Sequence, residues 1–336
     1  MILANNDLSE NEIVADLHVL PVSHITYSDG LAVSQYINLT KSPVAYITRP
    51  TTQLGTKPAP LMAVFSSAGP NPITPEILKP DISAPGVSII AAYRPEDQLF
   101  DKHQVVFNAM SGTSMSCPHV SGIAGLLKSL HPTWSPAAIK SAMMTTARTQ
   151  DNTIHAMTNT SHLKATPLSY GAGHVEPNRA MDSGLVYDLT VDDYLTFLCS
   201  LNYNQSQITL FAEEPYSCPK QISLTDFNYP SITIPNLNGS ITVTRKVKNV
   251  GSPGTYKARV VRPPGITVSV EPNSLQFDKI GEEKSFKLKL KLKQRSAAKE
   301  YVSGKLIWCE ESHCGQGNLK FKEVLMFISS SFVVAS

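Results

Sequence analysis

The last third of the chain alternates apolar and polar residues with a period of two. Residues 240–247 and 285–293 follow this pattern, and turns rich in Gly, Pro and Asn separate the alternating stretches. A period of two places the apolar side chains of a strand on one face of a sheet. The spacing therefore predicts a small antiparallel β-sandwich over residues 226–309.

The second alternating stretch also carries a run of lysines. These lysines stand between Phe286, Leu288, Leu290 and Leu292. Strict alternation predicts that the four apolar side chains pack inward while the lysines face solvent, so the run is a solvated strand face rather than a basic patch. The formal net charge of +2 likewise gives no reason to expect a nucleic-acid partner.

The middle of the chain has helical periodicity. Residues 114–130 carry an apolar stripe, and a second helix is predicted to begin with Ser135 as N-cap and Pro136 at the first helical position, ending near Ala147. A short apolar run, residues 87–92, precedes both and predicts a buried strand. The stripe of the first helix consists of Val120, Ile123, Ala124, Leu127 and Leu130. A strand followed by helices is typical of an α/β fold, which we assign to residues 58–210.

The two ends of the chain give weaker patterns. Residues 1–57 predict short strands at 14–20 and 44–48, with a helix at 29–38 that takes Asp29 as its N-cap. We interpret this segment as part of a domain. Residues 310–336 fit no element well and form a divergent tail.

Composition adds hints about the compartment. With 42% hydrophobic and 17% charged residues, the chain of 336 residues has the balance of a globular protein of two or slightly more domains. Cys199 and Cys218 can bridge a short loop in an oxidising compartment, although two buried free thiols explain them equally well. Four Asn-x-Ser/Thr sequons favour secretion, at Asn38, Asn159, Asn204 and Asn238.

No targeting or membrane segment accompanies these hints. The N-terminus has neither a basic start nor a long apolar run, so it predicts no signal peptide. The apolar stretch at 327–334 is too short to span a membrane. We also find no calcium-binding loop, and we predict no cofactor or metal.

The candidate chemistry lies at the start of the first predicted helix. Ser114 follows Gly112 and Thr113 there, and Gly112 allows a sharp turn. A serine nucleophile needs a base and a site for the oxyanion, and the free N–H groups and dipole of a helix N-terminus favour negative charge. A serine before a helix is more often a simple N-cap, so position alone does not establish catalysis.

The surrounding motif changes that balance. The octapeptide at 112–119, Gly-Thr-Ser-Met-Ser-Cys-Pro-His, resembles the nucleophile motif of the subtilisin family of serine proteases, especially its plant, cucumisin-like members. Further segments resemble the same family at 65–71 (with Ala68 where Arg is usual), 79–86, 134–142, 170–175, 184–188 and 228–232. The resemblance extends to about residue 308.

This resemblance implies a fold and an activity. It implies the C-terminal half of a subtilisin-like parallel-sheet catalytic domain, preceded by the end of a protease-associated domain and followed by a fibronectin type III-like sandwich. It also implies a secreted or cell-wall endopeptidase that cleaves peptides or proteins by acyl transfer, with Ser114 as nucleophile. Full-length members can form homodimers through the protease-associated domain.

The resemblance further implies that several catalytic groups lie outside this chain. In the family the catalytic Asp, the catalytic His and the oxyanion Asn precede the protease-associated domain, and we expect this chain to begin within that domain. Asp81, His103 and Ser114 do occur in triad order, but Asp81 matches a supporting loop and His103 lies in a charged stretch. We interpret His119 and His174 as structural.

The sequence leaves two functional hypotheses open. The chain is either a part of an active secreted protease, inactive when isolated, or a non-catalytic binding or decoy relative. After Trp308 the sequence departs from the family's pattern, so we also expect the last sandwich strand to be lost and any bridge between Cys309 and Cys314 to be in doubt.

Overall fold

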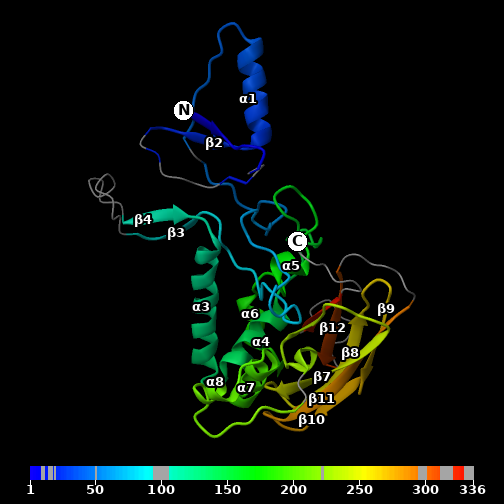
Figure 1. The fold of residues 1–336 in the computed structure, drawn as a ribbon. Coiled ribbons are helices and arrows are strands. Elements are labelled where there is room, and N and C mark those ends of the chain that lie inside the picture. Colours follow the sequence, from blue (N-terminus) through cyan, green and yellow to red (C-terminus); the bar gives the residue numbers. More distant parts are fainter. Residues whose placement is uncertain are drawn as a thin grey trace.

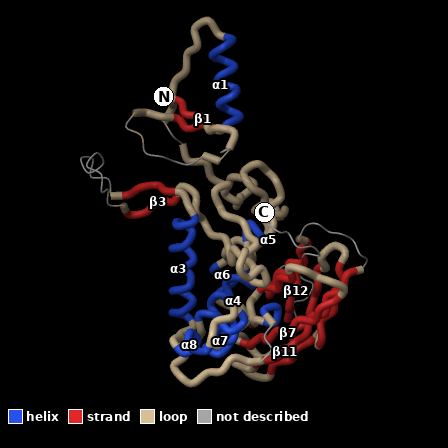
Figure 2. The backbone as a smooth tube through the Cα atoms, in the orientation of Figure 1, coloured by secondary structure: helices blue, strands red, loops and turns tan. Residues whose placement is uncertain are grey.

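The computed structural model describes residues 1–8, 12–13, 18, 20–49, 51–93, 106–220, 223–293 and 301–310, and the backbone of 321–328. Three parts succeed one another along the chain: a small N-terminal part, a central helical part and a C-terminal β-sandwich (Figure 1). Figure 2 shows how fully strands dominate the last part and how much of the central part is loop. No helix among the described residues is long and apolar enough to cross a membrane.

The N-terminal part consists of one helix beside two short strands. Strands β1 (Ile2–Ala4) and β2 (Ser23–Ile25) pair in parallel, and α1 (Tyr27–Leu39) comes next. The predicted helix is therefore present, but its N-cap is Thr26 and not Asp29. The Thr26 hydroxyl accepts a hydrogen bond from the Asp29 amide and donates one to the Asp29 carboxylate, so Asp29 lies within the first turn.

The strand predicted at 44–48 is wrong. The structure has no strand there, and the side chains of Val44 and Tyr46 are 77% and 88% exposed. The backbone N–H and C=O of Val44 both bond to the Tyr36 hydroxyl, at 3.2 and 3.3 Å, so they are not free to pair with a neighbouring strand. Most of the strand predicted at 14–20 lies outside the described residues.

The central part contains the first predicted helix as α3 (Thr113–Leu130), after a hairpin of β3 (Ile89–Ala92) and β4 (Phe107–Met110). The run at 87–92 thus forms a strand, but the prediction of a buried one is wrong, since Ile90 is 74% exposed. Within the described part of the chain, the strand pairs only with β4, and the two-stranded sheet leaves the Ile90 side chain open to solvent. On α3, Leu127 is buried while Leu130 is exposed, which corrects one position of the predicted stripe.

The second predicted helix is confirmed as α4 (Pro136–Thr146). Ser135 caps it by accepting a hydrogen bond from the Ala138 amide, and Pro136 occupies its first turn. Nine of its residues are buried, so α4 is the central helix of this part and lies between α3 and the sandwich (Figure 1). The shorter elements after it are α5 (Pro167–Tyr170), α6 (Pro177–Ala180), β5 (Leu185–Val186), α7 (Val191–Ser200), α8 (Gln205–Thr209) and η1 (Leu224–Asp226).

The sandwich consists of two sheets. One has the strand order β5-β7-β11-β9 and the other β10-β8-β12-β13-β6. Since β5 pairs with β7, the first sheet includes residues that precede the predicted start at 226. The remaining strands are β6 (Ser231–Ile234), β7 (Ser240–Asn249), β8 (Gly254–Val261), β9 (Ile266–Glu271), β10 (Ser274–Phe277), β11 (Glu283–Leu292), β12 (Val302–Glu310) and β13 (Phe321–Ile328).

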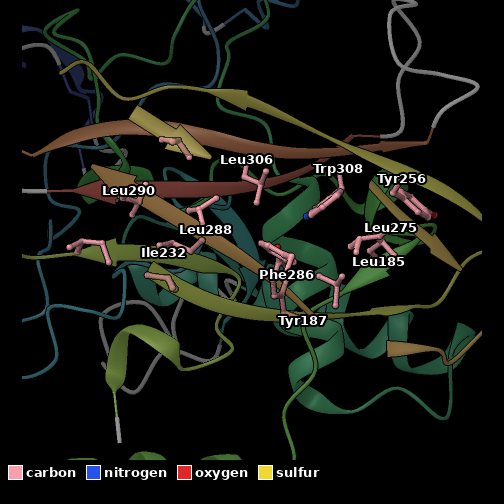
Figure 3. Packing of buried hydrophobic residues seen from close by; sticks show 14 of the residues in the cluster. Leu185, Tyr187, Ile232, Tyr256, Leu275, Phe286, Leu288, Leu290, Leu306 and Trp308 are labelled. Carbon is pink, nitrogen blue, oxygen red and sulfur yellow. The ribbon is translucent and has the colours of Figure 1, made fainter. Parts of the chain in front are cut away.

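The period-two prediction is confirmed in β7 and β11. These strands pair antiparallel, and Phe286, Leu288 and Leu290 of β11 are buried while the lysines between them are exposed. Side chains from both sheets meet in one core, where Phe286 packs edge-on against Trp308 at 5.1 Å between ring centroids (Figure 3).

The predicted loss of a last sandwich strand is also wrong. The backbone of β13 pairs antiparallel with β12 and parallel with β6, and so closes the five-stranded sheet between them. The sequence of this stretch, Phe-Lys-Glu-Val-Leu-Met-Phe-Ile, is rich in strand-forming residues even though it departs from the family's pattern. The prediction relied on resemblance where local propensity was the better guide.

A disulfide joins Cys199 of α7 to Cys218, with 5.8 Å between their Cα atoms. We expect the double variant Cys199→Ser, Cys218→Ser to lower the free energy of unfolding by about 3 kcal/mol, because a link across 19 residues restricts the unfolded chain. Urea unfolding of the oxidised protein measures this loss. Cys117→Ser, at an exposed free thiol, is the control and should change stability little. Equal stability of the double variant and the parent would contradict the prediction.

Candidate active site

Ser114 lies at the junction between the hairpin and helix α3. It is the second residue of the helix and its side chain is exposed. Gly112 precedes the helix with φ 156° and ψ 164°, a backbone region that is essentially restricted to glycine. The N-cap is thus Gly112, and the alternative interpretation of Ser114 as an N-cap is wrong. The turn places the Ser114 hydroxyl at the open end of the helix.

The N-terminus of α3 has no side-chain cap. Of the four described helices with ten or more residues, α1, α4 and α7 are capped by the hydroxyls of Thr26, Ser135 and Thr190, whereas α3 has no cap hydrogen bond from a side chain. Its first turn also contains no acidic residue. The amide of Ser114 is therefore one of the first N–H groups of the helix, for which no helix carbonyl one turn earlier can accept a hydrogen bond. It also lies at the positive end of the helix dipole. Such a site favours an oxyanion.

The segment at residues 81–86 supports this turn. The Gly112 amide donates to the Gly86 carbonyl at 2.8 Å, and the Ser116 hydroxyl donates to the Ala84 carbonyl at 2.9 Å. The two bonds flank Ser114 on both sides in the sequence. The position of Ser114 therefore depends on residues 81–86. No pattern in the sequence indicates this role for Ser116, since a bond to a carbonyl 32 residues away has no local signature.

A cavity of about 600 Å³ lies against the same turn. Thr113, Ser116 and Val120 of α3 line one side, and Phe65 and Ile82 come from the loops that precede the helix. The lining is mainly apolar, so the space beside the turn at residues 112–116 suits apolar groups. Ser114 itself is not among the residues that line it.

None of the described histidines or carboxylates completes a triad with Ser114. Asp81 instead binds Lys79 and Tyr229, at 2.7 and 2.6 Å. His103, the other member of the alternative triad, lies outside the described residues. No hydrogen bond reaches the Ser114 hydroxyl within the part of the chain that the structure describes.

The two remaining histidines of interest make structural contacts. His119 bonds through Nδ1 to the Met115 carbonyl, one turn earlier in α3, at 2.8 Å. The amide and carbonyl of His174 bond to Arg148, and burial lowers the pKa of its imidazole. Both Nδ1 atoms face backbone carbonyls of the protein itself, and neither histidine forms a hydrogen bond to the Ser114 hydroxyl among the described residues.

The four sequon asparagines differ in their surroundings. Asn38 is exposed on α1, and Asn204 caps α8 by accepting a hydrogen bond from the Gln207 amide. The side-chain oxygen Oδ1 of Asn159 accepts hydrogen bonds from two backbone amides of its own turn, those of Ser161 and Leu163. Asn238 is exposed between β6 and β7. A bridge from Cys309 to Cys314 would involve a residue outside the described ones.

Comparisons with known proteins agree with the nucleophile motif. Residues 19–173 match the model of the subtilase family, and residues 226–315 match that of a fibronectin type III domain. Subtilisin-like protease SBT5.4 of Arabidopsis thaliana is 56% identical over 93% of this chain. The chain belongs to the subtilase family. Subtilisin-like protease SBT5.3 of the same plant is 54% identical over 93% of this subtilase chain, and a soybean subtilisin-like protease, Glyma18g48580, is 48% identical over 80% of it.

The matches cover only part of each relative. The subtilase chain spans about two fifths of the length of the curated relatives it matches, 41% for SBT5.4. The expected fold class, a subtilase α/β part followed by a fibronectin type III-like sandwich, is confirmed by the two family matches. The subtilase match begins at residue 19, so the assignment of residues 1–57 to a protease-associated domain stays a prediction. One solved structure, a FixG-related protein from Vibrio parahaemolyticus, overlaps 28% of the chain at a TM-score of 0.21, which is too low to carry an argument.

Proposed function

We propose that this subtilase chain supplies the nucleophile and its oxyanion amide to a serine endopeptidase. The observation that carries the proposal is the exposed Ser114 hydroxyl at the uncapped N-terminus of α3. Attack of Ser114 Oγ on a peptide carbonyl forms a tetrahedral oxyanion, and the Ser114 amide lies where it can donate to that oxygen. Collapse of this intermediate expels the amine and leaves an acyl-enzyme on Ser114, which water hydrolyses.

The proton of Ser114 needs a base that the described residues do not supply. The family resemblance assigns this role to a His, oriented by an Asp and assisted by an oxyanion Asn, all from segments of the family that this chain does not match. We therefore propose that the isolated chain is unreactive and that catalysis requires those segments. Exposed apolar side chains on α3, Leu126 and Leu130 at 65% and 56%, suit a helix that packs against further protein.

A fluorophosphonate probe tests this proposal, since it labels only an activated serine. We expect no labelling of the isolated chain. We expect strong labelling of a chimaera in which this chain replaces the matching 41% of SBT5.4, which carries the rest of a subtilase. Labelling of the isolated chain at Ser114 would contradict the absence of a base. A folded but unlabelled chimaera would favour the alternative function, a non-catalytic binding relative.

The wider assignments belong to the same proposal. Substrates are peptides or proteins, with no nucleic-acid partner. The four sequons and the disulfide between Cys199 and Cys218 support secretion to the extracellular space or cell wall. A homodimer through the protease-associated domain is proposed only for the full-length protein.

A further inference from the structure

Four residues from three separate segments of the chain form one polar cluster between the subtilase part and the sandwich. The Tyr229 hydroxyl donates to Asp81 Oδ1 at 2.6 Å, and Lys79 Nζ bonds to the same oxygen at 2.7 Å. Lys140 of α4 lies 3.4 Å from Asp81 Oδ2. Tyr229 lies just before β6 of the sandwich, and its neighbour Asn228 bonds to the Lys246 backbone of β7. The cluster therefore links the sandwich to α4 and to the loop of Asp81.

Two ammonium groups and a hydroxyl donor surround Asp81 and keep its carboxyl group ionised. Burial alone would raise the pKa of the Asp81 carboxyl, but the charge of Lys79 and the hydrogen bonds from Lys79 and Tyr229 outweigh it and lower that pKa. The ammonium groups of Lys79 and Lys140 also lie 5.7 and 5.5 Å from the centre of the Tyr229 ring. Tyr229 is 5% exposed, so its hydroxyl is fixed in direction as well as in distance. Tyr229 is thus a buried, fixed hydrogen-bond donor to Asp81.

Asp81 begins the segment that supports the nucleophile turn. Its carbonyl accepts the Ala172 amide at 2.9 Å, and two residues later Ser83 bonds through its amide and carbonyl to Gly173 and Val175. The segment then reaches the Ala84 and Gly86 carbonyls that hold the turn around Ser114. Tyr229 fixes one end of residues 81–86, and the nucleophile turn rests on the other.

We propose that Tyr229 is a positioning residue through which the sandwich fixes the geometry of Ser114. This inference rests on the proposed function, because it concerns the placement of the proposed nucleophile. Tyr229 holds the Asp81 carboxylate, Asp81 holds residues 81–86, and these hold Gly112 and the first turn of α3.

Hydrogen–deuterium exchange on the isolated chain tests the link without any catalysis. Tyr229→Phe keeps the ring and removes the hydrogen bond to a charged group. We expect exchange at the Gly112 amide and in residues 81–86 to speed up about tenfold, while β7 and β11 stay protected. Tyr256→Phe is the matched control, since Tyr256 lies in the sandwich core against Phe277, away from Asp81, and should leave the Gly112 amide unchanged. Unchanged exchange at Gly112 in Tyr229→Phe would overturn the proposal.

A milder variant and a kinetic measurement complete the test. Hydrogen exchange could instead rise at every amide of the Tyr229→Phe variant, and the decisive variant is then Lys140→Gln. This change removes only the half-exposed ion pair with Asp81. It should speed exchange at the Gly112 amide about twofold. No change there would overturn the proposal. In the SBT5.4 chimaera, Tyr229→Phe should lower kcat about tenfold with KM nearly constant, whereas a purely structural role would lower only the amount of folded enzyme. An inactive chimaera would contradict the proposed function. The exchange result would then decide by itself whether Tyr229 positions the turn around Ser114.

Discussion

Replacing Ser114 with alanine should lower kcat of the SBT5.4 chimaera by on the order of a millionfold. This magnitude comes from subtilisin itself rather than from this chain. The reason is that the proposed acyl-enzyme forms on the Ser114 hydroxyl, and alanine has no group that could take its place. Hydrolysis of a peptide substrate, measured on protein of verified fold, gives the ratio.

Ser116→Ala is the matched control for this experiment. It removes a hydroxyl two residues later on the same turn, whose role is to hold the Ala84 carbonyl. Losing one such hydrogen bond should reduce kcat by about tenfold or less. If Ser114→Ala retained as much activity as Ser116→Ala, Ser114 would not be the nucleophile, and the chimaera's activity would have another source.

Much of the sandwich can be predicted from the sequence because period two is a property of the strand itself. The alternation in β11 correctly separates buried Leu288 from the exposed lysines. The same pattern places Arg245 of β7 on an inward position, and the structure does bury it. What the alternation does not predict is how its charge is accommodated. The guanidinium donates to the carbonyls of Thr225 and Ser231, and burial lowers its pKa to about 10.

The helix boundaries depend on local chemistry as well. Ser135 and Pro136 predict the start of α4 because capping and the missing proline amide act within one turn. The failures at 44–48 and 87–92 have the opposite cause. Whether an apolar run is buried or paired depends on which segment lies beside it, and neither the Tyr36 hydroxyl nor the isolated hairpin can be read from the run itself.

The candidate site divides in the same way. Ser114, Gly112 and the helix after them form one continuous motif, so the sequence predicts their arrangement. The contact between Tyr229 and Asp81 joins residues 148 positions apart, and no local pattern indicates it. The support of the nucleophile turn is a product of tertiary packing.

The close approach of Gly171 to the loop of Asp81 gives the second large prediction. Gly171 has φ 65°, and a Cβ there would lie 2.5 Å from the carbonyl atoms of Asp81 and from the Pro80 oxygen. These neighbours are backbone atoms and cannot rotate away. We expect Gly171→Ala to lower the free energy of unfolding by about 2–5 kcal/mol, from the left-handed backbone and the overpacking together.

Gly239→Ala separates the two causes. Gly239 has a similar φ of 75°, but a Cβ there meets nothing within 4 Å. Gly239→Ala should therefore lower the free energy of unfolding only by the conformational cost of the left-handed backbone, about 1–2 kcal/mol. Urea unfolding of both variants measures the difference, which is the contribution of the contact with Pro80 and Asp81. Equal losses would mean that the 80–81 backbone yields to the added methyl group, and that the support beneath the nucleophile turn is softer than its packing indicates.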